Sequence, residues 1–499
     1  MEVLYFVQTF FATPAILIGL FGMIGSILQK KKATQVLTST FKTITGYLVL
    51  GGGAGVLVGS ISHFNSVFEA VFGVSGVIPN NDALGAVYAA MAQIGTLAAL
   101  IMIIGMMGNI LLAAVTKWKY IYLSGHVLFY MSCMIAVALQ QIGMNPAWNK
   151  DAWMILMVGG LFMSMYLIIS PAISQRFMKV ITKTDTIAMA HTSGISYAIA
   201  GYIGEGLLKV SKKDKLKSTE EINFPKGLAF LRNSNVSVVL TMLLLFIILY
   251  ITAWIKIGKA GLVDIGYVSS DGSVIVQIII DAFTFAAGIE IILFGVRTVL
   301  AELVPAFKGV SEKLVKGAKP ALDCPVVFPY APNAVFIGFL SSLVGGIIMM
   351  AITIGLSKAD SVLFAIIIPG VTAHFFTGAT AGVFGNAKGG VWGSILGGFV
   401  NGILITLVPI AFWALSLVDK TEPMVWGDAD YAFGLILGIF SFIKLAWTKY
   451  LVLAVFLVLF GFMVTLGAIL QRKVNKNTSA NTPETPKVST TETTRTVKK

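Results

Sequence analysis

The sequence predicts an all-α polytopic membrane protein, because its composition is strongly apolar and because long apolar runs recur along it. Hydrophobic residues make up 57% of the 499 residues and charged residues 12%, which is outside the usual balance of a soluble domain. Uncharged runs that reach or nearly reach the roughly 20 residues needed to cross a bilayer lie at 12–28, 44–61, 97–115, 236–254 and 451–470. We interpret these runs as membrane helices, and a soluble enzyme is not expected.

Basic residues set the expected orientation of the chain. Lysine and arginine concentrate in 29–42, 117–119 and 176–232, which we place in the cytoplasm because positive residues favour the inner side of a membrane. The segment 63–82 has neither lysine nor arginine, and 419–430 has four acidic residues and one lysine, as expected of external loops. This alternation predicts about eleven transmembrane helices in the inner or plasma membrane, with the N-terminus outside and the C-terminus in the cytoplasm.

The remaining compositional features exclude several other classes. The net charge of +13 comes from the cytoplasmic loops and the tail, so it does not indicate a nucleic-acid partner. The two cysteines, Cys133 and Cys324, are far apart and have no metal-ligand spacing. None of the glycine clusters follows a strand and opens a phosphate-binding helix. We therefore expect no metal, no cofactor and no stand-alone catalysis.

A basic linker at 209–234 divides the chain into two halves that begin on opposite sides of the membrane, which is the inverted-repeat arrangement of many transporters. The first repeat is expected at 1–208, with spans one to five, and the second at 235–447. A last membrane helix is expected at 448–470. The stretch 471–499 is rich in Thr, Ser, Asn, Pro and Lys, so we expect a disordered cytoplasmic tail.

Each half also carries a proline-containing hydrophobic segment that is too broken for a plain span, near 72–91 in the first half and near 303–334 in the second. Proline removes a backbone donor, so such segments persist at membrane depth only where freed carbonyls face protein or a wet cavity. An ordinary proline kink is the alternative for either segment alone. Matching positions in both halves favour two re-entrant hairpins that line a substrate site.

Three ionisable residues are candidates for a polar site at membrane depth. His126 and His191 have small or apolar neighbours, and Asp323 lies between two prolines in the second broken segment. Ionisable groups are costly in a membrane and usually face a cavity, although a neutral histidine bonded to a carbonyl explains either histidine equally well. Asp281 and Glu290 point to opposite faces of one helix, so we interpret them as packing or interface charges.

Two long ordered blocks, together with shorter motifs around Thr43, His126 and Glu302, carry a family resemblance. The blocks consist of Asp323, Cys324, Ala331, Pro332, Asn333, Ala334 and Val335, and of Phe375, Phe376, Ala379, Thr380, Gly382, Val383, Phe384, Asn386, Gly389 and Gly390. Through them the chain, except its tail, resembles the ascorbate-specific permease component, enzyme IIC, of the bacterial PEP-dependent sugar phosphotransferase system.

The resemblance implies a homodimer in which a scaffold domain holds a mobile core domain that carries the sugar across the bilayer by an elevator motion. It also implies two separate partners. A IIB protein donates phosphate from its phosphocysteine to the bound sugar, and a IIA protein supplies IIB.

The resemblance further implies where the sugar binds. The substrate would lie between His126, His191 and Asp323, with Asn81 and Asp82 at the tip of the first hairpin. Asp323 would accept a hydrogen bond from a sugar hydroxyl, or would act as the catalytic base when that hydroxyl attacks the phosphocysteine of IIB.

Four positions depart from the pattern of ascorbate-transporting members. These members tend to have glutamine where this chain has Tyr130 and Thr192, and threonine and tyrosine where Asn81 and Asp82 stand. Exchanging amides for hydroxyls changes which substrate groups can be paired. Ascorbate is the first expectation, and a related sugar acid, a pentose derivative or a polyol is the competitor.

Two other functions remain open from the residues alone. In an ion-coupled secondary transporter, Asp323 and the two histidines would relay protons that drive a small polar solute. Neighbouring genes for IIA and IIB proteins would favour phosphotransfer instead. A channel is less favoured, because paired broken segments with inward ionisable residues are typical of transporters.

Overall fold

The computed structural model describes residues 14–480 apart from 74–75, 223–233, 444 and 446. Within these residues, seven helical runs are long and apolar enough to cross a membrane. They lie in α5 (Ala92–Val115), α7 (Ala152–Thr182), α9 (Ser234–Asp264), α10 (Val274–Leu314), α11 (Pro332–Ala359), the continuous run of α12 (Val371–Ala373), η5 (His374–Gly378) and α13 (Ala379–Ala414), and α15 (Thr448–Ala480). The predicted class, an all-α polytopic membrane protein, is confirmed.

Shorter helices fill the space between these runs. Three of them are apolar: α2 (Pro14–Leu28), α6 (Gly125–Gln141), and the pair η6 (Ala429–Gly434) and α14 (Leu435–Ser441). The helix α8 (Gly194–Ser211) packs against α13. Their close packing depends on small residues, because a Cβ added at Gly204 of α8 would lie 2.4 Å from the Gly385 carbonyl oxygen. The glycine-rich stretch of α13 thus allows close helix contact, as expected in membrane proteins.

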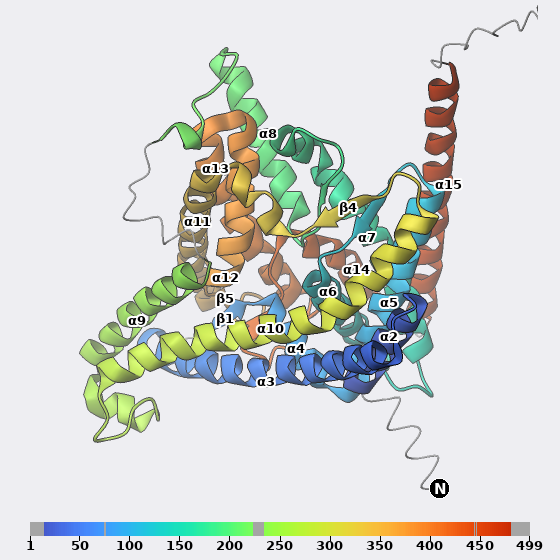
Figure 1. The fold of residues 1–499 in the computed structure, drawn as a ribbon. Coiled ribbons are helices and arrows are strands. Elements are labelled where there is room, and N and C mark those ends of the chain that lie inside the picture. The colour runs from blue at the N-terminus through green and yellow to red at the C-terminus, as the bar shows by residue number, and fades with distance from the viewer. Residues whose placement is uncertain (1–13, 74–75, 223–233, 444, 446, 481–499) are drawn as a thin grey trace, which may run out of the picture.

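Two helices, α3 (Ala33–Phe72) and α10, are far longer than an upright span requires. They contain 40 and 41 residues, or about 60 Å of helix each, against a hydrocarbon core of about 30 Å. Figure 1 shows them side by side, running across the direction of α11, α13 and α15. The predicted span 44–61 is therefore the middle of a long transverse helix.

Glycines allow α3 and α10 to pack closely against each other. A Cβ added at Gly53 would lie 2.7 Å from the backbone nitrogen of Ile292, and one at Gly288 would lie 2.9 Å from that of Leu57. Asp281 of α10 is buried at the same contact, with its Oδ1 3.6 Å from His63 Nδ1 of α3. Asp281 is a packing charge, as the sequence indicated.

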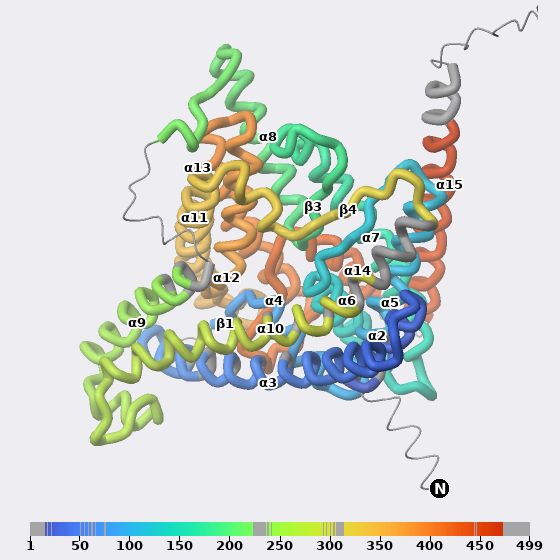
Figure 2. The backbone as a smooth tube through the Cα atoms, viewed as in Figure 1, coloured from blue at the N-terminus to red at the C-terminus, as the bar shows by residue number. Residues whose placement is uncertain are grey.

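The two broken segments form strands instead of helical hairpins. The first runs through β1 (Gly76–Pro79) into the short helix α4 (Asn81–Ala90). In the second, 303–314 continues α10, and the break consists of β4 (Lys319–Leu322) with the 3₁₀ turns η3 (Cys324–Val326) and η4 (Phe328–Tyr330). Figure 2 traces the chain through both segments. The first segment thus consists of a strand and a short helix, and the second leaves the helix only after Leu314 and not near 303.

Each broken segment contributes the central strand of a three-stranded parallel sheet. β1 lies between β5 (Ile366–Ile367) and β6 (Met424–Val425), and β4 lies between β2 (Tyr120–Tyr122) and β3 (Ala188–Met189). Every central strand therefore pairs with strands from the other half of the chain. The backbone groups that proline and the chain breaks expose are satisfied by this pairing, which is what allows non-helical backbone inside a membrane protein.

The linker and the C-terminal end differ from the expected boundaries. Residues 209–211 belong to α8, and the 3₁₀ turn η1 (Thr219–Glu221) packs on the start of α11, where Glu220 Oε1 accepts a hydrogen bond from Asn333 N at 2.8 Å. The helix α15 continues through 471–480, which was expected to be disordered. The rest of the expected tail lies outside the described residues. Helix propagation from an apolar span is cooperative, so a polar segment can extend it.

The close contact between α3 and α10 leads to a prediction about packing. Gly53→Leu is expected to destabilise the protein by about 1–3 kcal/mol, because the new side chain has no room against Ile292. Gly55→Leu is the matched control on the same helix, because a Cβ there meets nothing within 4 Å. Thermal unfolding of the two purified variants in detergent checks this. Equal melting temperatures would contradict the close contact.

Candidate functional site

A polar cavity lies where the two sheets end. Its volume is about 230 Å³, and both halves of the chain line it. The lining residues are Asn80, Asn81, Asp82, His126, Tyr130, His191, Arg297, Asp323, Pro325, Thr372, Ala373, Phe376, Thr377 and Asp428. Each of the six strands is followed, within five positions, by one of these residues. Parallel strands commonly present ligand-binding residues at their carboxyl ends, and here two such ends converge on one cavity.

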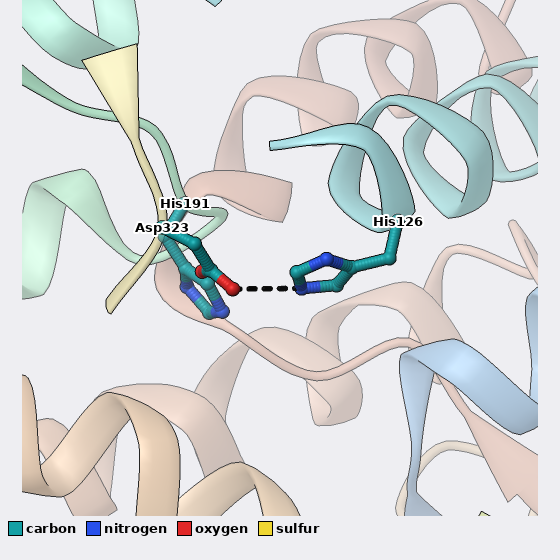
Figure 3. Close-up of side chains that lie close together, drawn as sticks. All are labelled: His126, His191 and Asp323. Carbon is teal, nitrogen blue, oxygen red and sulfur yellow. Dashed lines mark ion pairs between the residues drawn. The ribbon is translucent and has the colours of Figure 1, made fainter. Parts of the chain in front are cut away.

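The three predicted ionisable residues meet in this cavity. The closest ligand atoms of His126, His191 and Asp323 all lie within 4.8 Å of one another. Figure 3 shows His126 pointing from α6 toward Asp323, with His191 beside the carboxylate. The distance between His126 Nε2 and Asp323 Oδ2 is 3.4 Å. Candidate residues nearly 200 positions apart in the sequence thus form one cluster.

Asp323 is held by the end of β4. Its Oδ1 accepts a hydrogen bond from Cys324 N at 2.7 Å and so caps the turn η3. Its Oδ2 remains directed at His126. The side chain is 31% exposed, which leaves this oxygen accessible to a ligand. Asp323 therefore has the predicted access to the cavity, but a strand end positions it instead of the tip of a helical hairpin.

His191 is oriented by a tyrosine on the following helix. The Tyr197 hydroxyl of α8 lies 2.9 Å from His191 Nδ1 and 3.1 Å from the sulfur of Cys324, the residue after Asp323. Tyr197 thereby links the two sides of the cluster. Because Nδ1 is engaged in this contact, Nε2 is the His191 nitrogen left for a ligand.

Two of the four positions that depart from the ascorbate pattern, Tyr130 and Thr192, touch each other. The Tyr130 hydroxyl lies 3.3 Å from Thr192 Oγ1, and Thr192 in turn donates to Asp428 Oδ2. Since a hydroxyl carries one proton, Tyr130 is the donor to Thr192. Thr192 is fully buried and lies behind the cavity wall, whereas Tyr130 and Asp428 are in the wall. The two residues act on the cavity as one chain of hydrogen bonds.

Asn81 and Asp82 line the cavity from the start of α4, but in different ways. Asn81 Oδ1 accepts a hydrogen bond from Gly427 N at 2.8 Å and so fixes the chain after β6. The preceding residue, Asn80, caps α4 by accepting from Ala83 N at 3.1 Å. Asp82 Oδ1 is buried and has no hydrogen-bond partner among the described residues. Asp82 is thus the more available of the two predicted residues.

Two aspartates that the sequence placed in an external loop lie inside the protein. Asp428 and Asp430 are 2% and 0% exposed, so the prediction of an external loop is wrong for this end of 419–430. The strand β6 pairs with β1 and carries both residues inward. The apolar residues Trp426 and Tyr431, both fully buried, were the available signal in the sequence.

Other lining residues were also missed, and Arg297 is the most informative. It lies in α10 within a long apolar stretch, where a charged residue is costly unless it faces a cavity. Among the residues that line this cavity it is the only lysine or arginine, against the carboxylates of Asp82, Asp323 and Asp428. Such a lining offers many acceptors and suits a ligand with several hydroxyl donors better than a polyphosphate.

Three buried polar atoms of the cavity lining are unpaired. Asp82 Oδ1, Asp428 Oδ1 and Thr372 Oγ1 are buried without a hydrogen-bond partner among the described residues, and all three residues line the cavity. A buried polar group without a partner costs about 1–3 kcal/mol. Hydroxyl groups of a ligand would pair with these atoms.

An ion-pair cluster fixes the strands outside the cavity. Asp185, just before β3, contacts Lys179 Nζ at 2.7 Å and Lys319 Nζ of β4 at 2.8 Å. Partial burial raises the pKa of Asp185, but hydrogen bonds from the two lysines outweigh this effect and lower the pKa to about 2. Asp185 stays ionised at neutral pH and ties β4 to the loop that leads to His191.

Comparison with known proteins identifies the family of the chain. The model of the EIIC-GAT family, described as PTS system sugar-specific permease component, matches residues 9–430. The chain therefore belongs to the family of sugar-specific permease components of the phosphotransferase system, and the resemblance found in the sequence is confirmed.

One curated relative gives a more specific comparison. The chain is 26% identical over 395 residues to the "Ascorbate-specific PTS system EIIC component" of Mycoplasma pneumoniae. The match covers 70% of this chain and 57% of the relative, so it spans somewhat more than half of the relative's length.

Proposed function

We propose that the chain is the IIC subunit of a phosphotransferase system that binds L-ascorbate, or a related sugar acid or polyol, in the cavity around His126, His191 and Asp323. The observation that carries the proposal is the set of unpaired acceptors in a small cavity lined by both halves of a sugar-permease family member. At about 230 Å³ the cavity is below the roughly 300–1,000 Å³ of drug-sized sites. That volume fits one small sugar.

The choice of ascorbate rests on two considerations. The Mycoplasma pneumoniae relative is described as ascorbate-specific, and the carboxylates and other acceptors of the cavity suit a small ligand with several hydroxyl groups. Tyr130 and Thr192 replace the glutamines of ascorbate-transporting members. A related sugar acid, a pentose derivative or a polyol is the competing substrate.

The phosphoryl group comes from a separate IIB protein, which a IIA protein supplies. Both cysteines of this chain are buried, so they are poorly placed to receive phosphate from a partner. A sugar hydroxyl attacks the phosphorus of the IIB phosphocysteine, the S–P bond breaks, and an O–P bond forms. The hydroxyl proton passes to Asp323, whose Oδ2 beside His126 Nε2 is the accessible carboxylate oxygen. Phosphoryl transfer depends mainly on such positioning.

The architecture is that of two inverted repeats at 1–208 and 235–447, joined by 209–234 and followed by the membrane helix that begins at 448. A long helix, a strand and a short helical element follow one another in both halves, first as α3, β1 and α4 and then as α10, β4 and η3. Each central strand pairs with strands of the other half. The transverse helices α3 and α10 form the scaffold. The sheets and the helices around them form the core that carries the sugar in an elevator motion within a homodimer.

In this proposal the protein lies in the inner or plasma membrane with the N-terminus outside and the C-terminus in the cytoplasm. The lysine-rich stretch after α8 is then cytoplasmic, and IIB approaches from that side.

Uptake of labelled ascorbate in cells that contain IIA and IIB tests the proposal. The accumulated product is expected to be a phosphate ester.

His126→Ala and His191→Ala are each expected to weaken binding by about 1–2 kcal/mol, because a sugar hydroxyl loses its partner. His63→Ala is the control, because His63 lies on α3, half exposed and outside the cavity. An unmodified accumulated product would favour an ion-coupled transporter, and unchanged affinity in both variants would remove the histidines from the site.

Asp323→Asn separates binding from proton transfer. The amide keeps the shape and part of the hydrogen bonding but removes basicity, so IIB-dependent phosphorylation is expected to fall by about 100-fold or more, with a smaller loss of sugar affinity. Single-turnover phosphorylation with phosphorylated IIB and equilibrium binding measure the two effects. Equal losses would leave Asp323 as a binding residue only.

The contact between Tyr130 and Thr192 leads to a prediction about specificity. Thr192 is fully buried, so Thr192→Gln alone is expected to be overpacked and to lower stability by about 1–3 kcal/mol. Adding Tyr130→Gln makes room and gives two amides, and the double variant is expected to regain stability and to prefer ascorbate over other sugars. Competition assays that show no shift in preference would exclude these positions as the source of specificity.

A further inference from the structure

We propose that Asp430 is a positioning residue that holds the His191 loop in its sugar-binding geometry, an inference that rests on the proposed binding site. Asp430 is fully buried and does not line the cavity. It lies on η6, the element that follows β6, and thus in the half of the chain that does not contain His191. Contact with the sugar therefore does not explain why a charged residue lies in this position.

The carboxylate of Asp430 contacts both helices that flank His191. Oδ1 accepts a hydrogen bond from Ile195 N at 2.7 Å, at the start of α8. Oδ2 lies 2.7 Å from Ser170 Oγ and 3.1 Å from the Tyr166 hydroxyl, both on α7. A carboxylate at a helix N-terminus is favoured by the unpaired backbone N–H groups there and by the helix dipole.

The two hydroxyls connect the carboxylate to His191 itself. The backbone oxygen of His191 lies 3.2 Å from Ser170 Oγ and 3.4 Å from the Tyr166 hydroxyl. Each hydroxyl has one proton, so one can bond Asp430 while the other bonds the His191 carbonyl. The loop is therefore held on both its main chain and the helix that follows it.

Further hydrogen bonds align the segment 428–430 with the loop along its length. Asp430 N donates to the Thr192 carbonyl at 2.7 Å, Ala429 N donates to Ser193 Oγ at 3.2 Å, and Thr192 donates to the Asp428 carboxylate. These bonds join residues that are more than 230 positions apart in the sequence. The orientation of His191 thus depends on the other half of the chain.

Charge is the property that makes Asp430 effective. Ile195 N and one of the two hydroxyls donate to this carboxylate in a fully buried place. An amide keeps one acceptor and turns the other into a donor, so the hydroxyl that donated to Asp430 must reverse its bond and the charge-assisted bonds become neutral ones. The bonds that hold the loop would be weaker, while the side chains of the cavity wall stayed unchanged. A positioning role predicts that removing the charge of Asp430 affects the sugar only through His191.

A double-mutant cycle on the full-length protein tests this. Asp430→Asn is expected to weaken labelled ascorbate binding about tenfold, and to weaken it hardly at all in a His191→Ala background, because both changes remove the same interaction. Ser170→Ala, which keeps the charge and removes one donor, is the milder second variant and should show a smaller loss with the same dependence on His191. Asp281→Asn is the control, because Asp281 is a buried carboxylate at the α3–α10 contact. Additive losses for Asp430 and His191, or unchanged affinity in folded Asp430→Asn, would overturn the proposal.

A second readout works without any sugar. Diethylpyrocarbonate modification of His191, followed by mass spectrometry, should be faster in Asp430→Asn than in the wild type, whereas modification of His374, buried and 2.8 Å from Ser342 Oγ, should not change. Parallel increases at both histidines would mean general loosening and would overturn the positioning role. If the wild type binds no ascorbate, the proposed substrate fails and this readout alone decides the role of Asp430.

Discussion

Parallel strand pairing between the two halves of the chain is the constraint on which the cavity depends. Proline and the breaks near β1 and β4 leave backbone groups that no helix satisfies. In a membrane protein these groups cannot turn to solvent, so they must pair within the fold. The pairing of β1 with β5 and β6, and of β4 with β2 and β3, meets this need. It also forces the chain ends that follow six strands into one small space.

The polar side chains of the site are a consequence of that convergence. Each strand end delivers one or more polar groups to the same 230 Å³. Several of them fix neighbouring backbone, as Asn81 does for Gly427 and Asp323 for Cys324, and several leave an atom available to a ligand. Buried polar networks are stable only when nearly all members are satisfied. The few unsatisfied acceptors in this network are therefore the atoms that the proposed hydroxylated ligand would pair.

The transverse helices α3 and α10 pack closely against each other. Their contact depends on glycines such as Gly53 and Gly288, which let the backbones approach more closely than any side chain would allow. Among the side chains of this pair that the structure describes, only Arg297 lines the cavity. The cavity thus lies against the long helices while the strands and the helices around them supply nearly all of its chemistry. A division into a supporting part and a ligand-carrying part is consistent with this arrangement.

The sequence by itself determined the class of fold and named three candidate residues that meet in the cavity. Apolar runs, the cost of ionisable groups in a membrane and the ordered blocks around Asp323 and Gly382 were local signals, and they predicted a helical membrane protein with His126, His191 and Asp323 as candidates. Only the tertiary structure decided that the broken segments are strands, that α3 lies across the other helices, and that Asp428 and Asp430 are inside. The reason is that strand pairing is non-local: Thr192 meets Asp428 only because β1 draws β6 inward. From composition alone, the segment 419–430 with its four acidic residues is predicted to be a solvent-exposed loop. Its composition carries no information about β1, the distant strand that buries its end.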